Sequence, residues 1–287
     1  MRIYPDCVPC LAKFTLDAAQ RATQDADLLV NISLKGLRII LDHGPEAMPP
    51  QIAQAINRMI TRLTKVDDPY REEKRQHNRS AMSLYPSLRK EIHESSDPLR
   101  TALRAAAGGN RIDSVFSQGL EPQRVIEHSL TSDFVIDHYD VLRQTLGRSS
   151  TLLVLGDNAG EIAFDKLMIE EIKRVYPELT VTYVVKGGPV INDATMDDAR
   201  AVDMGAVAEV VDNGDNAPGT ILSQCSSEMQ QLFHRADTLI VKGQGNFETL
   251  EEERKEGVFF LLQVKCPVVA RNVDAPIDSL ILYQPTS

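Results

Sequence analysis

The chain has 287 residues, a formal net charge of −10 and a pI of about 5.1, with 43% apolar and 25% charged residues. This length is sufficient for one large or two smaller domains with buried cores. The acidic balance argues against a nucleic-acid partner, because a phosphate backbone requires a basic binding surface. No apolar run approaches the roughly 18 residues that span a bilayer, and the first residues lack the apolar core of a signal peptide. We therefore expect a cytoplasmic protein without a membrane partner.

The first half of the sequence predicts helices. Apolar residues recur every three to four positions over residues 10–23, 27–43, 52–63, 80–92 and 99–107. Residues 125–130 and 135–146 are further helix candidates. No alternating strand pattern of any length occurs before residue 149, so we expect an all-helical domain over residues 1–148.

The pattern changes at Ser149. Five short apolar runs of strand length occur at residues 152–155, 181–185, 207–211, 238–241 and 267–270. Helical patterns lie between them, at about residues 161–175, 190–204, 218–235 and 247–262. Strands that alternate with helices predict a parallel sheet covered by helices, and continuous apolar runs predict strands buried on both faces. The predicted fold class is therefore α/β, with a helical N-terminal region followed by a Rossmann-like domain over residues 149–287.

Polar side chains follow each predicted strand. Asp157 and Asn158 follow the first, Lys186 the second, Asp212 the third and Lys242 the fourth, while Arg271-Asn272 follows the fifth. Parallel strands bring their carboxyl ends to one edge, where ligands bind in such sheets. Carboxylate and amide oxygens are ligands for Mg²⁺ or Mn²⁺, and lysines and glycine amides hold phosphate. The edge is thus equipped for phosphoryl transfer or phosphate-ester hydrolysis. The dinucleotide and P-loop glycine motifs are absent.

The polar residues in the turn after the first strand can be interpreted in two ways. Asp157 or Asn158 simply caps the following helix, or both ligate a cation while the backbone N–H groups of Gly160 and Glu161 receive a phosphate oxygen. The Glu161 carboxylate either orients an attacking water or interacts favourably with the helix dipole.

Four cysteines are present, and Cys7 and Cys10 form a CxxC pair. In a reducing compartment such a pair is more typical of a metal or redox element than of a disulfide. Cys225 and Cys266 do not form a second CxxC, which excludes a zinc ribbon. Redox CxxC pairs usually follow a strand, and none is evident here, so a structural role or packing near the cleft is the favoured interpretation.

Taken together, a series of short motifs resembles the damage-control phosphatase family, also called domain of unknown function 89, in its CxxC-bearing subfamily I of archaea and some bacteria. The motifs, in order, are Cys7-Val-Pro-Cys10, His77-Asn78, Asp97-Pro-Leu99, Gly109-Asn-Arg-Ile-Asp113, Gly156-Asp-Asn-Ala-Gly-Glu161, Asn192-Asp-Ala-Thr195, Lys242-Gly-Gln-Gly-Asn246 and Val264-Lys-Cys266. The resemblance covers essentially the whole chain. It implies a helical N-terminal part, a Rossmann-like C-terminal domain and a divalent-metal-dependent phosphatase that acts on phosphorylated metabolites, including sugar phosphates.

The resemblance also implies roles for individual residues. Asp157, Asn158 and Asp193 resemble the metal ligands of the family. Gln244 and Asn246 lie in a turn that resembles its substrate-binding loop.

Lys265 corresponds to a lysine that contacts substrate phosphate in related subfamilies, although the Arg-Thr pair that precedes that lysine is absent here. The residues themselves add Lys242 as a second cation for the phosphate.

Our hypothesis from the sequence is a phosphatase with a Mg²⁺, Mn²⁺, Co²⁺ or Ni²⁺ ion, because an all-oxygen ligand set suits each of these ions. Asp157 and Glu161 are the candidate catalytic residues, and Lys242 and Lys265 would neutralise charge on the phosphate. The partner would be a phosphorylated small molecule. The alternatives are a protein that binds metal or phosphometabolite without turnover and a thiol redox protein that uses Cys7 and Cys10.

Overall fold

The computed structural model describes residues 1–109, 130, 132–253 and 255–285. Its helices are α1 (Cys7–Ala22), α2 (Ala26–His43), α3 (Pro49–Thr64), α4 (Arg71–Glu94), α5 (Pro98–Gly108), α8 (Tyr139–Leu146), α9 (Glu161–Val175), α10 (Met196–Ala201), α11 (Ser227–Arg235), α12 (Gln244–Leu250) and α13 (Pro267–Val273). Its strands are β1 (Phe134–Asp137), β2 (Thr151–Leu155), β3 (Thr180–Val185), β4 (Glu209–Asp212), β5 (Thr238–Lys242), β6 (Val258–Gln263) and β7 (Leu280–Tyr283). Two short 3₁₀ turns, Met204–Ala206 and Leu222–Gln224, complete the described elements.

The seven strands form one sheet in the order β1-β7-β6-β5-β2-β3-β4. All neighbouring pairs are parallel except β6 and β7. The chain runs outward in one direction from β2 to β3 and β4, and then returns to the other side of β2 as β5. The strand order therefore reverses between β2 and β5, and in open α/β sheets ligands bind in the crevice outside the carboxyl ends of such strands.

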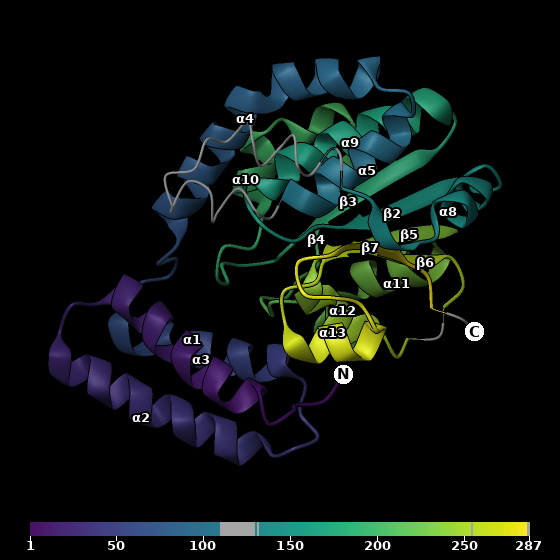
Figure 1. Ribbon diagram of the computed structural model, residues 1–287. Helices are drawn as coiled ribbons and strands as arrows, with labels where there is room; N and C mark the ends of the chain where they lie inside the picture. Colours follow the sequence, from purple (N-terminus) through teal and green to yellow (C-terminus); the bar gives the residue numbers. More distant parts are fainter. Residues whose placement is uncertain (110–129, 131, 254, 286–287) are drawn as a thin grey trace.

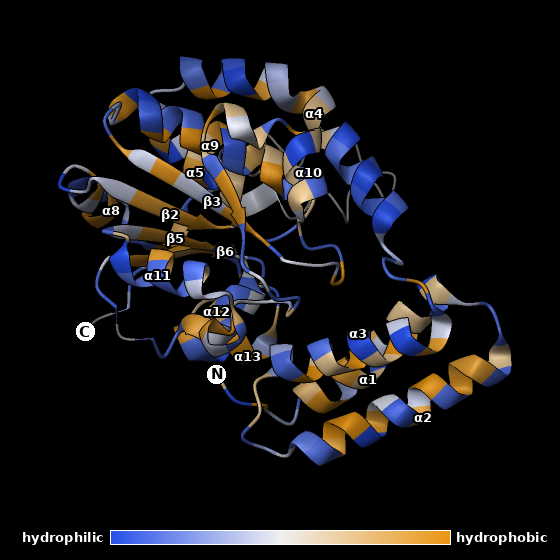
Figure 2. Ribbon diagram, turned by 180° about the vertical axis from the view of Figure 1, so that it is seen from behind, coloured by the Kyte–Doolittle hydropathy of each residue, from blue (hydrophilic) through white to orange (hydrophobic). Residues whose placement is uncertain are grey.

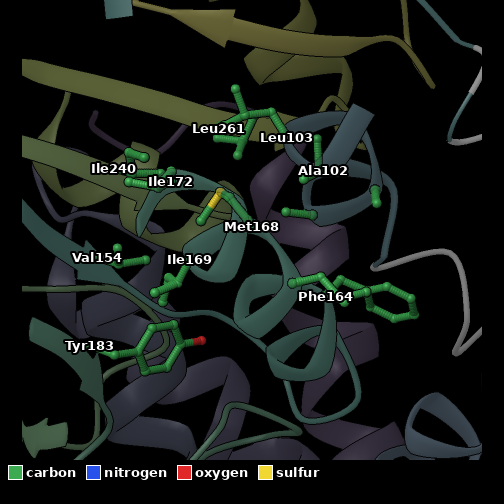
Figure 3. Close-up of a cluster of buried hydrophobic side chains, with 14 of the residues drawn as sticks. Ala102, Leu103, Val154, Phe164, Met168, Ile169, Ile172, Tyr183, Ile240 and Leu261 are labelled. Atoms are coloured by element: carbon green, nitrogen blue, oxygen red, sulfur yellow. The ribbon is translucent and has the colours of Figure 1, made fainter. Parts of the chain in front are cut away.

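Both faces of the sheet are covered, as the apolar strands require. Leu152 and Val154 of β2 pack into one hydrophobic core, whereas Leu153 and Leu155 pack into the other. Helices α4, α5, α8 and α9 cover the first face, and α11, α12 and α13 cover the second (Figure 1). Figure 3 shows the first core, in which side chains of α5 and α9 interdigitate with those of the central strands. Figure 2 shows the strands as predominantly hydrophobic between more polar helices.

Helices α1, α2 and α3 pack against one another and lie at one side of the sheet domain (Figures 1 and 2). Helix α3 also contacts α12, and the long helix α4 leads from this bundle to α9. The predicted fold class, a helical N-terminal region followed by a mostly parallel α/β sheet, is confirmed. One strand, β1, lies within the region that was predicted to be all-helical, and it pairs with β7. The domain boundary at residues 148 and 149 stays a prediction.

The first four predicted strands are present as β2, β3, β4 and β5, but the fifth is wrong. Residues 267–270 begin helix α13, because Pro267 supplies the fixed φ of a first helical position and Cys266 caps the helix by accepting from the Val268 N–H at 3.3 Å. Arg271 and Asn272 therefore lie within a helix and do not follow a strand.

A different strand, β6, overlaps the end of the predicted helix 247–262. That helix ends early as α12, and Gly257, at a φ of +76°, immediately precedes β6. Its run Val-Phe-Phe-Leu-Leu is fully buried, and such a run is compatible with either a buried helix or a buried strand.

The predicted helix 135–146 divides into β1 and α8, since the Asp137 carboxylate accepts from the Tyr139 N–H at 3.1 Å and stabilises a turn. The predicted helices 190–204 and 218–235 are shorter, as α10 and α11. Residues 125–129 of another predicted helix lie outside the described residues. None of the described helices is long and apolar enough to cross a membrane.

Candidate functional site

The site is built on two loops that follow the neighbouring strands β2 and β3. The Ala159 N–H donates to the Asn192 carbonyl at 2.9 Å, and the Ala194 N–H donates to the Asp157 carbonyl at 2.8 Å. Asn158 and Asp193 face each other in an isolated antiparallel bridge. The two segments that the sequence singled out, Gly156-Asp-Asn158 and Asn192-Asp193, are therefore held side by side by backbone hydrogen bonds.

The Asp157 side chain points toward the turn that follows the neighbouring strand β5. A Cβ atom at Gly243 would lie 2.0 Å from Oδ2 of Asp157, so only a glycine allows the carboxylate to rest against this turn. Gly243 also has a φ of +77°, which disfavours other residues. The carboxylate thus lies at the carboxyl end of the sheet, where the strand order reverses.

The carboxylates of this cluster are held in an environment that resists their ionisation. Burial raises the pKa of Asp157 well above its usual range, and the neighbouring Glu161 and Asp193 carboxylates add to the effect. Burial likewise raises the pKa of Asp193 to about 6, although Lys186 opposes the shift. Carboxylates that are crowded together and desolvated favour binding a cation, which stabilises their charged forms.

Lys186, at the end of β3, is the cation nearest to Asp193. Its buried ammonium lies 3.6 Å from Oδ2 of Asp193 and donates to the Gly219 carbonyl at 2.7 Å. Oδ2 of Asp193 is buried and accepts no hydrogen bond within the described part of the chain. A buried carboxylate oxygen with an ammonium at 3.6 Å and no hydrogen bond from the described residues is suited to ligate a metal ion.

The orientation of Asn158 fits the same interpretation. Its amide nitrogen donates to Oδ2 of Asp157 at 2.9 Å and lies 3.4 Å from Oε2 of Glu161. Its carbonyl oxygen is therefore the end of the amide that these carboxylates leave available to a cation. Among the described residues, no three His, Cys, Asp or Glu side chains are arranged as ligands of one ion, so a cation here would use two carboxylates and an amide.

Lys242 was predicted to contact phosphate, but it lies in the interior. It is fully buried, and its ammonium donates to Glu161 and Asp165 at 2.5 Å each and to the Ala106 carbonyl at 2.9 Å. Burial alone would lower the pKa of Lys242, but the Asp165 and Glu161 carboxylates raise it above the usual lysine value. All three N–H groups have partners, so this geometry favours a role in positioning Glu161.

The turn after β5 holds the two other predicted substrate residues. Asn246 is fully buried and donates to the backbone carbonyls of Gly156 and Lys242 at 3.0 and 2.8 Å, which fastens the end of β2 to the end of β5. Gln244 donates to Glu248 at 3.0 Å and accepts from the Lys265 N–H at 3.4 Å.

The Lys265 side chain is exposed, and its charge opposes the rise that burial causes in the pKa of both Asp157 and Glu161. It is thus a solvent-accessible cation at the edge of the carboxylate cluster, which is the environment that a phosphate requires.

Two other predicted site residues, Gly160 and Asp212, form hydrogen bonds within the protein. The Gly160 N–H, expected to receive a phosphate, donates to Oδ1 of Asn78 on α4 at 2.7 Å. Asp212 is exposed at the end of the edge strand β4, where its carboxylate accepts from the Gly214 N–H at 2.9 Å. Asp212 thus stabilises a turn at the outer edge of the sheet.

The CxxC pair lies at the start of α1, close to α13. Asp6 forms an ion pair with Arg271 at 2.7 Å, and Cys266 lies near both thiols. Cys7 is buried and accepts from the Tyr4 N–H at 3.4 Å, whereas Cys10 is exposed. Burial raises the pKa of both Cys7 and Cys10, with Cys266 adding to the effect. Redox-active thiols require the opposite shift.

Sequence reasoning missed the role of Lys186, Asp165 and Asn78. Lys186 and Lys242 both follow a strand, and nothing in the local sequence tells which ammonium is enclosed by carboxylates. Asp165, one turn beyond Glu161 on α9, is an acid within the predicted helix 161–175, and that alone was a weak signal. Asn78 lies in the His-Asn motif, but only the tertiary structure brings α4 to the β2 loop. Residues 110–113 of the Gly-Asn-Arg-Ile-Asp motif lie outside the described residues.

Comparison with known proteins gives a consistent result over the whole chain. Residues 3–281 match the model of the damage-control phosphatase ARMT1-like domain. A protein of Archaeoglobus fulgidus named damage-control phosphatase is 31% identical over 290 residues, covering 98% of each chain. A damage-control phosphatase of Pyrococcus horikoshii is 30% identical over 285 residues, covering 98% of this chain and 97% of the relative. The crystal structure of a DUF89 family protein from Pyrococcus horikoshii superposes with a TM-score of 0.92, at 30% identity and with complete coverage of both chains.

Proposed function

We propose that this chain, which belongs to the family of the damage-control phosphatase ARMT1-like domain, is a phosphatase. It would hydrolyse phosphate monoesters of small metabolites and require a divalent cation. The names of its relatives support the phosphatase role, and the residues at the sheet edge support the cation. The observation that carries the proposal is the meeting of Asp157, Asn158 and Asp193 on two hydrogen-bonded loops, which follow β2 and β3 beside the point where the strand order reverses.

Asp157, Asn158 and Asp193 would hold the cation. Mg²⁺, Mn²⁺, Co²⁺ and Ni²⁺ all suit an oxygen ligand set, and the bound ion would supply a Lewis acid that withdraws charge from a phosphate oxygen. The chain contributes the rigid placement of these oxygens. Glu161 and the β5 turn restrain Asp157 and Asn158, so little reorganisation is needed when a charged substrate arrives.

Lys265 would bind the substrate phosphate. It is exposed beside the carboxylates, whereas Lys186 and Lys242 are buried and already paired. A phosphorylated metabolite, such as a sugar phosphate, would therefore place its phosphate between the cation and the Lys265 ammonium. The acidic overall charge does not oppose this, because the local cation governs the binding of one phosphate group.

The test is phosphate release from a panel of sugar phosphates and nucleotides, using metal-stripped protein supplemented with each cation in turn. Asp157→Ala should lower the rate of phosphate release at least 100-fold. Asp212→Asn is the matched control, because it also removes one carboxylate at a strand end but keeps an oxygen for the Gly214 N–H.

Retention of full metal-dependent activity by Asp157→Ala would overturn the assignment of the site. Metal and substrate binding without phosphate release on any compound would instead support a binding protein without turnover.

A further inference from the structure

A chain of buried polar groups crosses from helix α4 to both loops of the site. Oδ1 of Asn78 accepts from the Gly160 N–H at 2.7 Å, and its amide nitrogen donates to Oδ1 of Asp198 at 2.8 Å. The other oxygen of Asp198 accepts from the Thr195 N–H at 2.9 Å and from the Thr195 hydroxyl at 2.7 Å. Gly160 closes the loop that carries Asp157 and Asn158, and Thr195 closes the loop that carries Asp193.

The members of this chain are enclosed and satisfied. Asn78 is 3% exposed and Asp198 is 4% exposed, so water competes little for their hydrogen bonds. The buried Lys74, one turn before Asn78, lies 3.4 Å from Asp198 and 3.0 Å from Asp68 and compensates both charges. Buried polar groups that are fully paired impose a specific geometry, because each lost partner leaves a desolvated group unpaired.

The approach of α4 is close enough to require glycine on the loop. A Cβ atom at Gly160 would lie 3.0 Å from the Cβ atom of His77, and Gly160 has a φ of +79°. The backbone of the β2 loop thus rests directly on α4, with the Asn78 side chain filling the remaining hydrogen-bonding position.

We propose that Asn78 and Asp198 form a clamp, by which helix α4 sets the separation of the two loops that bear Asp157, Asn158 and Asp193. Both are positioning residues, since neither lies among the candidate ligands. The clamp acts in addition to the backbone bonds between the loops, and it makes the helical region part of the active site. The inference about catalysis rests on the proposed function, but the clamp itself is testable without turnover.

Single substitutions should break the clamp through mismatched donors and acceptors. Asn78→Asp would place a second carboxylate 2.8 Å from Asp198. Asp198→Asn would turn an amide nitrogen either toward the nitrogen of Asn78 or toward the donors of Thr195. In both cases, two groups of the same kind meet in a buried site.

The double exchange, Asn78→Asp with Asp198→Asn, should repair the clamp. The new carboxylate on α4 would accept from the Gly160 N–H and from the new amide, whose oxygen would accept from Thr195. The net charge is unchanged, and Lys74 retains its ion pair with Asp68. Rescue by the exchanged pair is an outcome that a merely destabilised helix would not produce.

The first measurement is amide hydrogen exchange of residues 156–162 and 192–197 in metal-stripped protein. Asn78→Ala and each single exchange variant should speed exchange at the Gly160 and Thr195 amides at least tenfold, and the double variant should restore protection to within threefold. Asn57→Ala is the matched control, since Asn57 is another buried asparagine of the helical region and donates to the Pro189 carbonyl at 3.3 Å. It should leave both amides protected.

The second measurement is calorimetric titration with Mn²⁺, in which the single variants should bind 10- to 100-fold more weakly, as is typical when groups that orient metal ligands are removed. Unchanged exchange at Thr195 in Asn78→Ala, or a double variant no better than the singles, would overturn the clamp. If the wild type binds no Mn²⁺ or releases no phosphate, the proposed function fails, whereas the exchange data still decide the clamp.

Discussion

Replacing Lys242 by methionine should destabilise the protein far more than the loss of a surface lysine. The ammonium is fully buried and is the shared partner of Glu161 and Asp165, at 2.5 Å from each. Methionine has a similar volume but leaves these carboxylates without their cation. Removal of one partner from a buried ion pair costs about 3–5 kcal/mol, because the remaining charge stays desolvated. For a chain of this size, such a loss corresponds to a fall in Tm of roughly 10 °C.

The pH dependence identifies the cause. Burial raises the pKa of Glu161 and Lys242 opposes this rise, so without Lys242 the Glu161 carboxylate takes up a proton on folding. The free energy of unfolding should therefore recover as the pH falls from 8 to 5, which urea denaturation at the two pH values would measure. Lys13→Met, at an exposed pair with Asp17, is the control and should change stability little at either pH. A Lys242→Met protein as stable as this control at pH 8 would refute the assignment of Lys242 to the interior.

Three further predictions follow from individual side chains. Burial raises the pKa of Glu248 to about 7, so Glu248→Gln should raise the free energy of unfolding at pH 8 by about 1–3 kcal/mol and by little at pH 5; an equal difference at both pH values in urea denaturation would contradict the shift. Lys265→Ala should raise KM for a sugar phosphate about tenfold with little change in kcat, as expected for the loss of roughly 1.4 kcal/mol of phosphate binding, and steady-state kinetics with an unchanged KM would remove Lys265 from the site. Because the pKa values of Cys7 and Cys10 are raised, their alkylation at pH 7 should be slow and their joint replacement by serine should leave phosphate release within twofold; rapid alkylation would revive the redox alternative.

The parts of the fold that the sequence predicted are those with a local physical cause. The apolar run before Gly156 is buried on both faces and forms β2, and the glycine turn leads into α9 as expected. The error at residues 258–270 has an equally physical origin. A fully buried apolar run has no periodicity, so β6 could not be distinguished from a helix, and Pro267 marked a helix start within a run that otherwise favoured a strand.

The candidate site was predictable in its composition but not in its charge pairing. Asp157, Asn158 and Asp193 share one edge because parallel strands end there, which follows from topology. The topology does not determine that Lys242 is buried and Lys265 is exposed. Lys242 becomes enclosed by α9 while Lys265 stays in solvent, and this depends on contacts across 77 and 81 residues of sequence.

The central claim, that these two loops hold the cation of a phosphatase, is tested most directly by phosphate release as a function of Mn²⁺ concentration. We expect saturable activation of the metal-stripped wild type and of Asp212→Asn. In Asp193→Asn, which weakens the ligand set while preserving its shape, the activation midpoint should move to at least 100-fold higher Mn²⁺. Phosphate release that persists in the presence of a chelator, or the same midpoint in Asp193→Asn as in the wild type, would contradict the claim.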